Sequence, residues 1–72
     1  MPSQSELNGV IAEILEVPQD SFDDASDLEE LGWDSLSSMT FISIADERYR
    51  SRIDVDRLAT AETPADLHEL FG

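Results

Sequence analysis

Apolar side chains recur at helical spacing near the start of the chain, and this pattern limits the possible folds more than any other feature. Ser3 and Glu6 have the spacing of a capping box, and Pro18 disfavours helix at the residue before it. Between them lies one apolar stripe, which comprises Leu7, Val10, Ile11, Ile14 and Leu15. The pattern predicts an amphipathic helix over residues 4–16.

A second helix is predicted over residues 35–50. Gly32 permits a turn before it, and Asp34 is a good N-cap because its carboxylate can accept from the free N–H groups of the first turn. We expect its core face to be formed by Phe41, Ile42, Ala45 and Tyr49. Leu36 and Met39 would then lie on a flank beside an exposed Ser35, where they either fill the core or contact a partner.

The remaining helices are predicted from their caps. Asp54 or its neighbour can cap a short helix over 55–59, with Ile53, Val55 and Leu58 facing inward. Thr63-Pro64-Ala65-Asp66 is typical of a helix start. That last helix should span 63–71. We therefore expect one all-α domain over 1–72, a small four-helix bundle of three longer helices and one short one. Its expected core comprises Leu7, Ile11, Ile14, Phe41, Ile42, Ala45, Leu67 and Leu70.

Residues 17–34 form a long acidic connection, which is unusual in so small a domain and often functional. Phe22, Leu28 and Leu31 are its expected anchors in the core. Its aspartates lack the alternating ligands, the central glycine and the final glutamate of a calcium loop. We therefore predict solvated carboxylates there and no metal site.

The charge is strongly one-sided, with 17 Asp and Glu, four Arg and a formal net charge of −13. Such a chain should repel nucleic acid and anionic membranes and be attracted to basic partners. Arg48, Arg50 and Arg52 cluster where the dipole of the second helix favours cations, so we assign them a structural role first. The chain has no cysteine, no run long enough to span a membrane and no signal-peptide pattern at its start, so we expect a cytoplasmic protein.

The sequence does not favour catalysis by Ser35. A nucleophilic serine needs a base, yet lysine is absent and the one histidine, His68, is expected on a solvated face of the last helix. There is no glycine-rich phosphate loop, and a small domain has little room to enclose a substrate pocket. We therefore expect a protein that is not an enzyme and has no catalytic residue of its own. Ser35 could instead be a hydroxyl that another enzyme modifies.

The stretch Leu28-Glu29-Glu30-Leu31-Gly32-Trp33-Asp34-Ser35-Leu36 resembles the attachment motif of acyl carrier proteins and peptidyl carrier domains, and the similarity in helix pattern covers nearly the whole chain. The resemblance implies a four-helix bundle in which Ser35 receives a 4′-phosphopantetheine arm from coenzyme A. The thiol of the arm then carries an acyl group as a thioester. Asp34 and Leu36 match the residues that flank the modified serine.

The resemblance also implies partners. These are a phosphopantetheinyl transferase, a loading enzyme and downstream synthases or transferases with basic docking patches, bound to a monomeric carrier. Trp33, Leu36, Met39 and Val55 are the candidate contacts with them. Trp33 and the following Ser37-Ser38-Met39-Thr40 depart from fatty-acid carriers and resemble free-standing carriers of specialised pathways. Met1 and the closing Phe71-Gly72 lead us to expect a complete stand-alone protein.

Two alternatives remain open at this point. The carried group could be an aminoacyl or peptidyl unit of a nonribosomal-peptide-type pathway rather than an acyl group of a fatty-acid, polyketide or other pathway. The chain could also be an acidic helical interaction module or nucleic-acid mimic, in which Asp34 and Ser35 only cap a helix.

Overall fold

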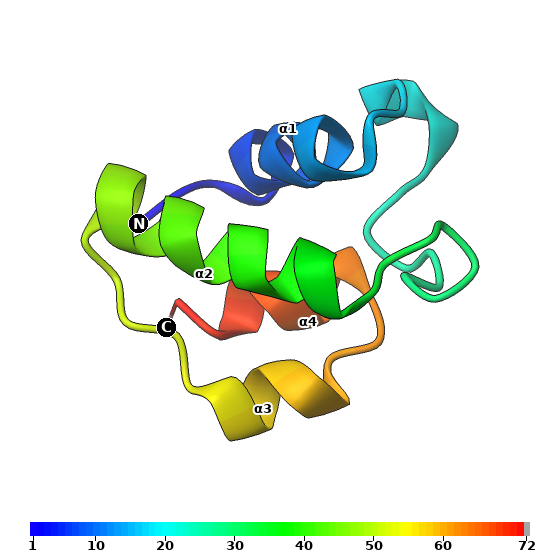
Figure 1. Ribbon diagram of the computed structural model, residues 1–72. Helices are drawn as coiled ribbons and strands as arrows, with labels where there is room; N and C mark the ends of the chain where they lie inside the picture. Colours follow the sequence, from blue (N-terminus) through cyan, green and yellow to red (C-terminus); the bar gives the residue numbers. More distant parts are fainter. Residues whose placement is uncertain (72) are drawn as a thin grey trace.

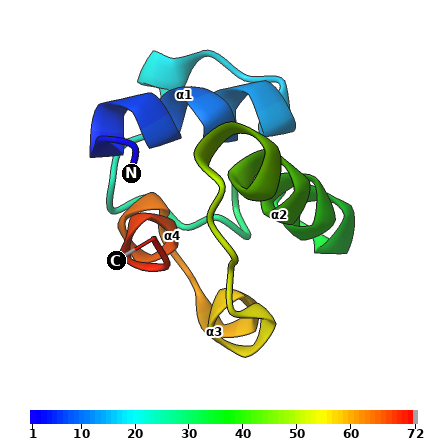
Figure 2. The ribbon, with the colours of Figure 1, turned by 90° about the vertical axis from the view of Figure 1, so that its left-hand side faces the viewer.

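The computed structural model describes residues 1–71, and every regular element within them is a helix. The elements are α1 (Gln4–Leu15), the 3₁₀ turn η1 (Gln19–Ser21), α2 (Ser35–Tyr49), α3 (Val55–Thr60) and α4 (Pro64–Glu69). In two perpendicular views, α1 lies on one side of α2 and α4, and α3 lies on the opposite side (Figures 1 and 2). The predicted all-α, four-helix architecture is confirmed, although two helices are long and two are short.

The caps follow local chemistry. The side chains of Ser3, Asp34, Asp54 and Thr63 each accept a hydrogen bond from the backbone of the following turn, as predicted. Thr63 completes a reciprocal capping box with Asp66. At α1 only half of the expected box forms, because Ser3 accepts from the Glu6 N–H while the carboxylate of Glu6 is bound elsewhere.

Both long helices end in a left-handed residue. Glu16 has φ 58° and Arg50 has φ 52°, and the N–H of each binds back to carbonyls of the last turn. The helices therefore end at Leu15 and Tyr49, one residue before the predicted ends. The last helix is shorter than the predicted 63–71, because Leu70 and Phe71 close a tighter turn with hydrogen bonds to Leu67 and His68.

The long connection of residues 16–34 is tied to the bundle at several points. The buried side chain of Asn8 donates to Asp24 Oδ1, at 2.6 Å, and the N–H of Ala65 donates to the carbonyl of Asp24 at 3.0 Å. The N–H of Leu28 donates to the carbonyl of Glu62 at 2.9 Å. Phe22, Leu28 and Leu31 pack on the core as predicted, with Leu28 fully buried.

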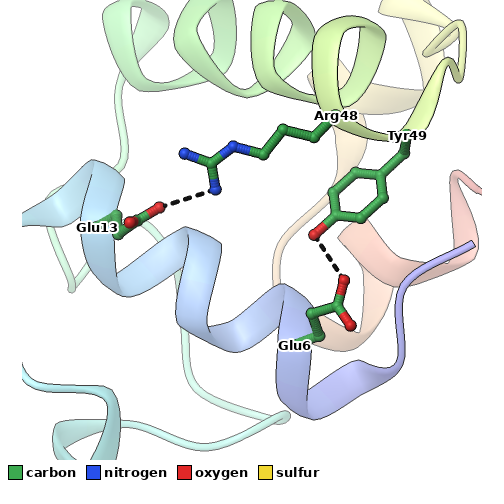
Figure 3. A network of polar contacts seen from close by, with 4 residues as sticks. All are labelled: Glu6, Glu13, Arg48 and Tyr49. Atoms are coloured by element: carbon green, nitrogen blue, oxygen red, sulfur yellow. Dashed lines mark hydrogen bonds and ion pairs between the residues drawn. The ribbon is translucent and has the colours of Figure 1, made fainter.

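Polar contacts also join α2 to α1 (Figure 3). The hydroxyl of Tyr49 donates to Glu6 at 2.9 Å, and Arg48 forms an exposed ion pair with Glu13 at 3.2 Å. The structural interpretation of the arginine cluster is thus confirmed for Arg48. Because both side chains are exposed, the pair links the end of α2 to α1 but adds little to stability.

The core lies between α1, α2 and α4. Its buried apolar side chains are Leu7, Val10, Ile11, Leu28, Phe41, Ala45, Ile53, Leu58 and Leu67. Three predicted core residues, Ile14, Ile42 and Leu70, are only half buried and pack at its edge. On α2 the innermost side chains, at Ser37, Phe41 and Ala45, are each four positions apart, which turns Ile42 towards α3.

Candidate functional site

The turn that leads into α2 depends on Gly32. Gly32 has φ 98°, a conformation that side-chain-bearing residues rarely adopt, and no atom lies within 4 Å of the position that a Cβ would take. The requirement for glycine is therefore conformational rather than steric. The N–H of Trp33 then donates to the carbonyl of Leu28 at 2.9 Å, which closes the loop directly before the helix.

Asp34 is the N-cap of α2. Its Oδ1 accepts from the backbone N–H of Ser37 at 2.9 Å and from the Ser37 hydroxyl at 3.0 Å. Both bonds lower the pKa of Asp34 from its ordinary value, and the backbone bond has the larger effect. The carboxylate is therefore ionised at neutral pH and fixed in orientation at the start of α2.

Ser35 is the first residue of the 15-residue helix α2 and is exposed, as predicted. Within residues 1–71, its hydroxyl makes no hydrogen bond to another group. His68 is engaged elsewhere, because its Nε2 donates to the carbonyl of Pro2 at 2.9 Å. That contact leaves His68 half buried, so the expected solvated position was wrong.

A groove of about 400 Å³ lies beside Ser35, between α2 and α3. Trp33 and Met39 line it together with Asp34, Ser35, Ser38, Ile42, Val55, Leu58, Ala59 and Ala61. The indole of Trp33 is fixed there, since its Nε1 donates to Ser38 Oγ at 2.9 Å and its ring meets Phe41 edge-on at 6.0 Å.

Three large apolar side chains are exposed on α2 and α3. Met39 and Val55 line this groove, whereas Leu36 lines a separate hollow beside α1. Leu36 is 71% exposed, Met39 is 67% exposed and Val55 is 62% exposed. The structure therefore excludes core filling as the role of Leu36 and Met39. The prediction that Val55 faces inward was wrong, because as the first residue of α3 it lies outside the side that Leu58 buries.

The structural roles of Ser37 and Ser38 were not predicted from the sequence. Ser37 follows the cap residue Asp34 by three positions, which is the spacing of a reciprocal capping pair and could have indicated its role. Ser38 accepts from Trp33 across the helix start, at a separation of five residues for which no local pattern exists. The groove likewise depends on where α3 packs.

Neither a metal-binding cluster nor a membrane-spanning helix is found in residues 1–71. No group of three or more His, Cys, Asp or Glu side chains in this range could hold a metal ion. No helix in the same range has the length and apolar character needed to cross a membrane.

Comparison with known families decides the class of protein. A family model described as the phosphopantetheine attachment site matches residues 5–71. The chain belongs to this family. Its members bear 4′-phosphopantetheine covalently, so the chain is a carrier domain for that prosthetic group. Searches of curated proteins and of solved structures find no match to the chain.

The start of α2 fits such an arm. The exposed hydroxyl of Ser35 can form a phosphodiester without displacing a packed side chain. The positive end of the helix dipole favours the anionic phosphate, although the nearby carboxylate of Asp34 offsets part of this attraction. When bound, the arm supplies the thiol that this cysteine-free chain lacks.

Proposed function

We propose that Ser35 is the attachment residue and that the protein is an acyl carrier protein. The observation that carries this proposal is the exposed hydroxyl of Ser35 at the start of α2, which makes no hydrogen bond within residues 1–71, in a chain that belongs to the attachment-site family. Among the other α2 serines, Ser37 is buried against Asp34 and Ser38 accepts from the indole of Trp33. Ser43 is exposed, but it lies two turns into the helix.

The attachment step requires an external catalyst. Ser35 Oγ forms a bond to the phosphorus of the coenzyme A pyrophosphate that bears the pantetheine. The bond from that phosphorus to the bridging oxygen breaks, and the nucleotide part leaves. The proton of Ser35 passes to a base of the transferase, because no base in residues 1–71 is hydrogen-bonded to it. The carrier itself is therefore not an enzyme in this proposal.

The protein would act as a monomeric carrier domain over 1–72 in the cytoplasm, with the Trp33-Asp34-Ser35-Leu36 form of the motif. Its partners would be a phosphopantetheinyl transferase, a loading enzyme and downstream synthases. Trp33, Leu36, Met39 and Val55, which are exposed or line the groove, would contact them. The net charge of −13 would attract partners whose docking sites lie in a basic field.

The decisive experiment compares intact mass before and after incubation with coenzyme A, magnesium and a promiscuous transferase. We expect one addition of the arm to the wild type, none to Ser35→Ala, and an unchanged addition to the matched control Ser43→Ala. A wild type that stays unmodified with several transferases would instead support an acidic interaction module in which Asp34 and Ser35 only cap α2.

The carried group is a second question, with an aminoacyl or peptidyl unit as the alternative to an acyl group. Trp33 and the hydroxyl-rich start of α2 resemble carriers of specialised pathways, which take both kinds of load. Incubating the modified protein with a panel of acyl- and amino-acid-activating enzymes separates the two. A thioester formed only with amino acids would replace the acyl carrier assignment by the aminoacyl one.

A further inference from the structure

Two hydrogen-bonded bridges span Ser35 at the start of α2. The inner bridge joins the cap residue Asp34 to Ser37, through the backbone N–H at 2.9 Å and the hydroxyl at 3.0 Å. The outer bridge joins Trp33, the residue before the cap, to Ser38, because the indole Nε1 donates to Ser38 Oγ at 2.9 Å. Ser35 lies inside both bridges and takes part in neither.

The outer bridge is anchored to the core. The ring of Trp33 meets Phe41 edge-on at 6.0 Å, and Phe41 is only 1% exposed. Phe41 in turn meets Phe71 edge-on at 5.8 Å. Edge-on aromatic pairs add stabilisation beyond the apolar area that they bury. The half-buried indole therefore connects the start of α2 to a ring that is fixed in the interior.

The turn before α2 has little else that fixes it to the helix. The N–H groups of Gly32 and Trp33 donate to the carbonyls of Glu29 and Leu28, so these bonds close the loop and do not reach α2. Within residues 1–71, the indole of Trp33 is the one group before Asp34 that hydrogen-bonds to the start of α2. The angle at which the chain enters the helix therefore depends on this side chain.

That angle matters for the attachment reaction. Ser35 Oγ has to approach the phosphorus of coenzyme A roughly in line with the bond that breaks. Within residues 1–71 the hydroxyl makes no hydrogen bond, so its direction is set by the backbone on either side of it. A misplacement of about 1 Å can lower the rate of such a step roughly 10²-fold.

We propose that Trp33 is a positioning residue for the attachment reaction: through its bond to Ser38, the indole holds the start of α2 so that Ser35 Oγ meets coenzyme A in one direction. The inference rests on the proposed function, because it concerns the transfer of the arm to Ser35. It gives Trp33 a role that differs from contact with partners. A contact residue tightens binding of the transferase, whereas a positioning residue raises the rate of transfer after binding.

Two variants remove the outer bridge from its two ends. Trp33→Phe keeps an aromatic ring next to Phe41 but has no N–H, and Ser38→Ala leaves the indole in place without its acceptor. Ser38→Thr restores a hydroxyl acceptor. Ser43→Ala is the matched control, because it removes an exposed hydroxyl of the same helix that lies outside the bridge. Circular dichroism first verifies that each variant has the helix content of the wild type.

The experiment follows single turnovers of each chain with an excess of a phosphopantetheinyl transferase that modifies the wild type, at saturating coenzyme A. It gives the maximal rate constant of transfer and the half-saturating transferase concentration. We expect Trp33→Phe and Ser38→Ala each to lower the maximal rate constant roughly fivefold to tenfold and to leave the half-saturating concentration within about twofold. The double variant should be no slower than either single one, because both remove the same bond. Ser38→Thr should recover most of the rate, and Ser43→Ala should match the wild type.

The fluorescence of Trp33, the one tryptophan of the chain, tests the bridge separately. Ser38→Ala should shift its emission to longer wavelength and increase its quenching by acrylamide, because the released indole meets more water. Ser43→Ala should change neither property.

Four results would overturn the proposal. Both single variants could be modified at the wild-type rate, or the loss could appear only in the half-saturating concentration, which would make Trp33 a contact residue. The losses could multiply in the double variant, which would mean that Trp33 and Ser38 act separately. The emission of Trp33 could also be unchanged by Ser38→Ala. Failure of the proposed function is distinct, since it appears as a wild type that gains no mass from coenzyme A.

Discussion

Replacing Ile11 and Ile42 by alanine should destabilise the protein to very different extents. The sequence pattern assigns both side chains to the core, with a similar expected loss of about 2–4 kcal/mol for each. In the structure Ile11 is fully buried in α1, whereas Ile42 is half buried and lines the groove between α2 and α3. Burial therefore separates two substitutions that are chemically identical.

The magnitude follows from what each substitution removes. Losing the carbon atoms beyond Cβ forfeits about 2.4 kcal/mol of transfer free energy when the side chain is fully buried, at about 0.8 kcal/mol per group. At Ile11 an enclosed cavity adds to this loss, which gives about 3–4 kcal/mol. At Ile42 part of the side chain already meets water and the space left is open, so about 1 kcal/mol is expected.

Urea denaturation followed by circular dichroism at 222 nm, a wavelength used for helices, measures both losses. A chain of 72 residues should have roughly 4–11 kcal/mol of total stability, so Ile11→Ala removes a large share of it. Its melting temperature should fall by about 4–8 °C per kcal/mol. Equal losses for the two variants, or a loss below about 1 kcal/mol at Ile11, would refute the assignment of the core.

Three further predictions concern charge. Added NaCl should raise the melting temperature, because it screens repulsion within a chain of net charge −13; a melting temperature indifferent to salt would mean that the acids are well dispersed. The pKa of Tyr49 is raised above its ordinary value of 10.0, mainly by burial and also by the hydrogen bond to Glu6. The Tyr49 hydroxyl therefore stabilises the fold below pH 10, and this stabilisation is lost as pH rises through the higher folded pKa. The free energy of unfolding of the wild type should thus fall above pH 10 more steeply than that of Tyr49→Phe. Urea titrations of both proteins at several pH values measure this, and equal slopes would mean that the hydroxyl is unimportant. The pKa of Asp34 is lowered, so its contribution to stability is present above its ordinary pKa of 3.8 and is lost as pH falls through the lower folded value. Asp34→Asn should therefore make the free energy of unfolding fall less steeply at acid pH. An unchanged pH dependence would contradict the capping role of Asp34.

The features that could be predicted from the sequence are those set by local chemistry. Asp34, Asp54 and Thr63 cap their helices because each side-chain oxygen reaches N–H groups two or three residues ahead, whatever the rest of the chain does. The apolar stripe of α1 is likewise a matter of helical period, and Leu7 and Ile11 are fully buried as expected. The start of α2, with its exposed Ser35, belongs to this group.

The features that could not be predicted depend on tertiary packing. The six-residue helix α3 has too few turns for its period to show which side is buried. Val55 was therefore predicted both to face inward and to contact partners, and only the structure shows that it is exposed. The contact of His68 with Pro2 joins residues 66 positions apart, and that of Tyr49 with Glu6 joins residues 43 apart. No local pattern encodes such pairs, and the groove beside Ser35 exists only once α3 is in place.

Peptide mapping shows directly which residue bears the prosthetic arm. The wild-type chain is modified with coenzyme A and a transferase, digested, and sequenced by tandem mass spectrometry. We predict that the added group lies on Ser35 and on none of the other α2 serines, Ser37, Ser38 and Ser43. An added group on another residue, or on none, would contradict it.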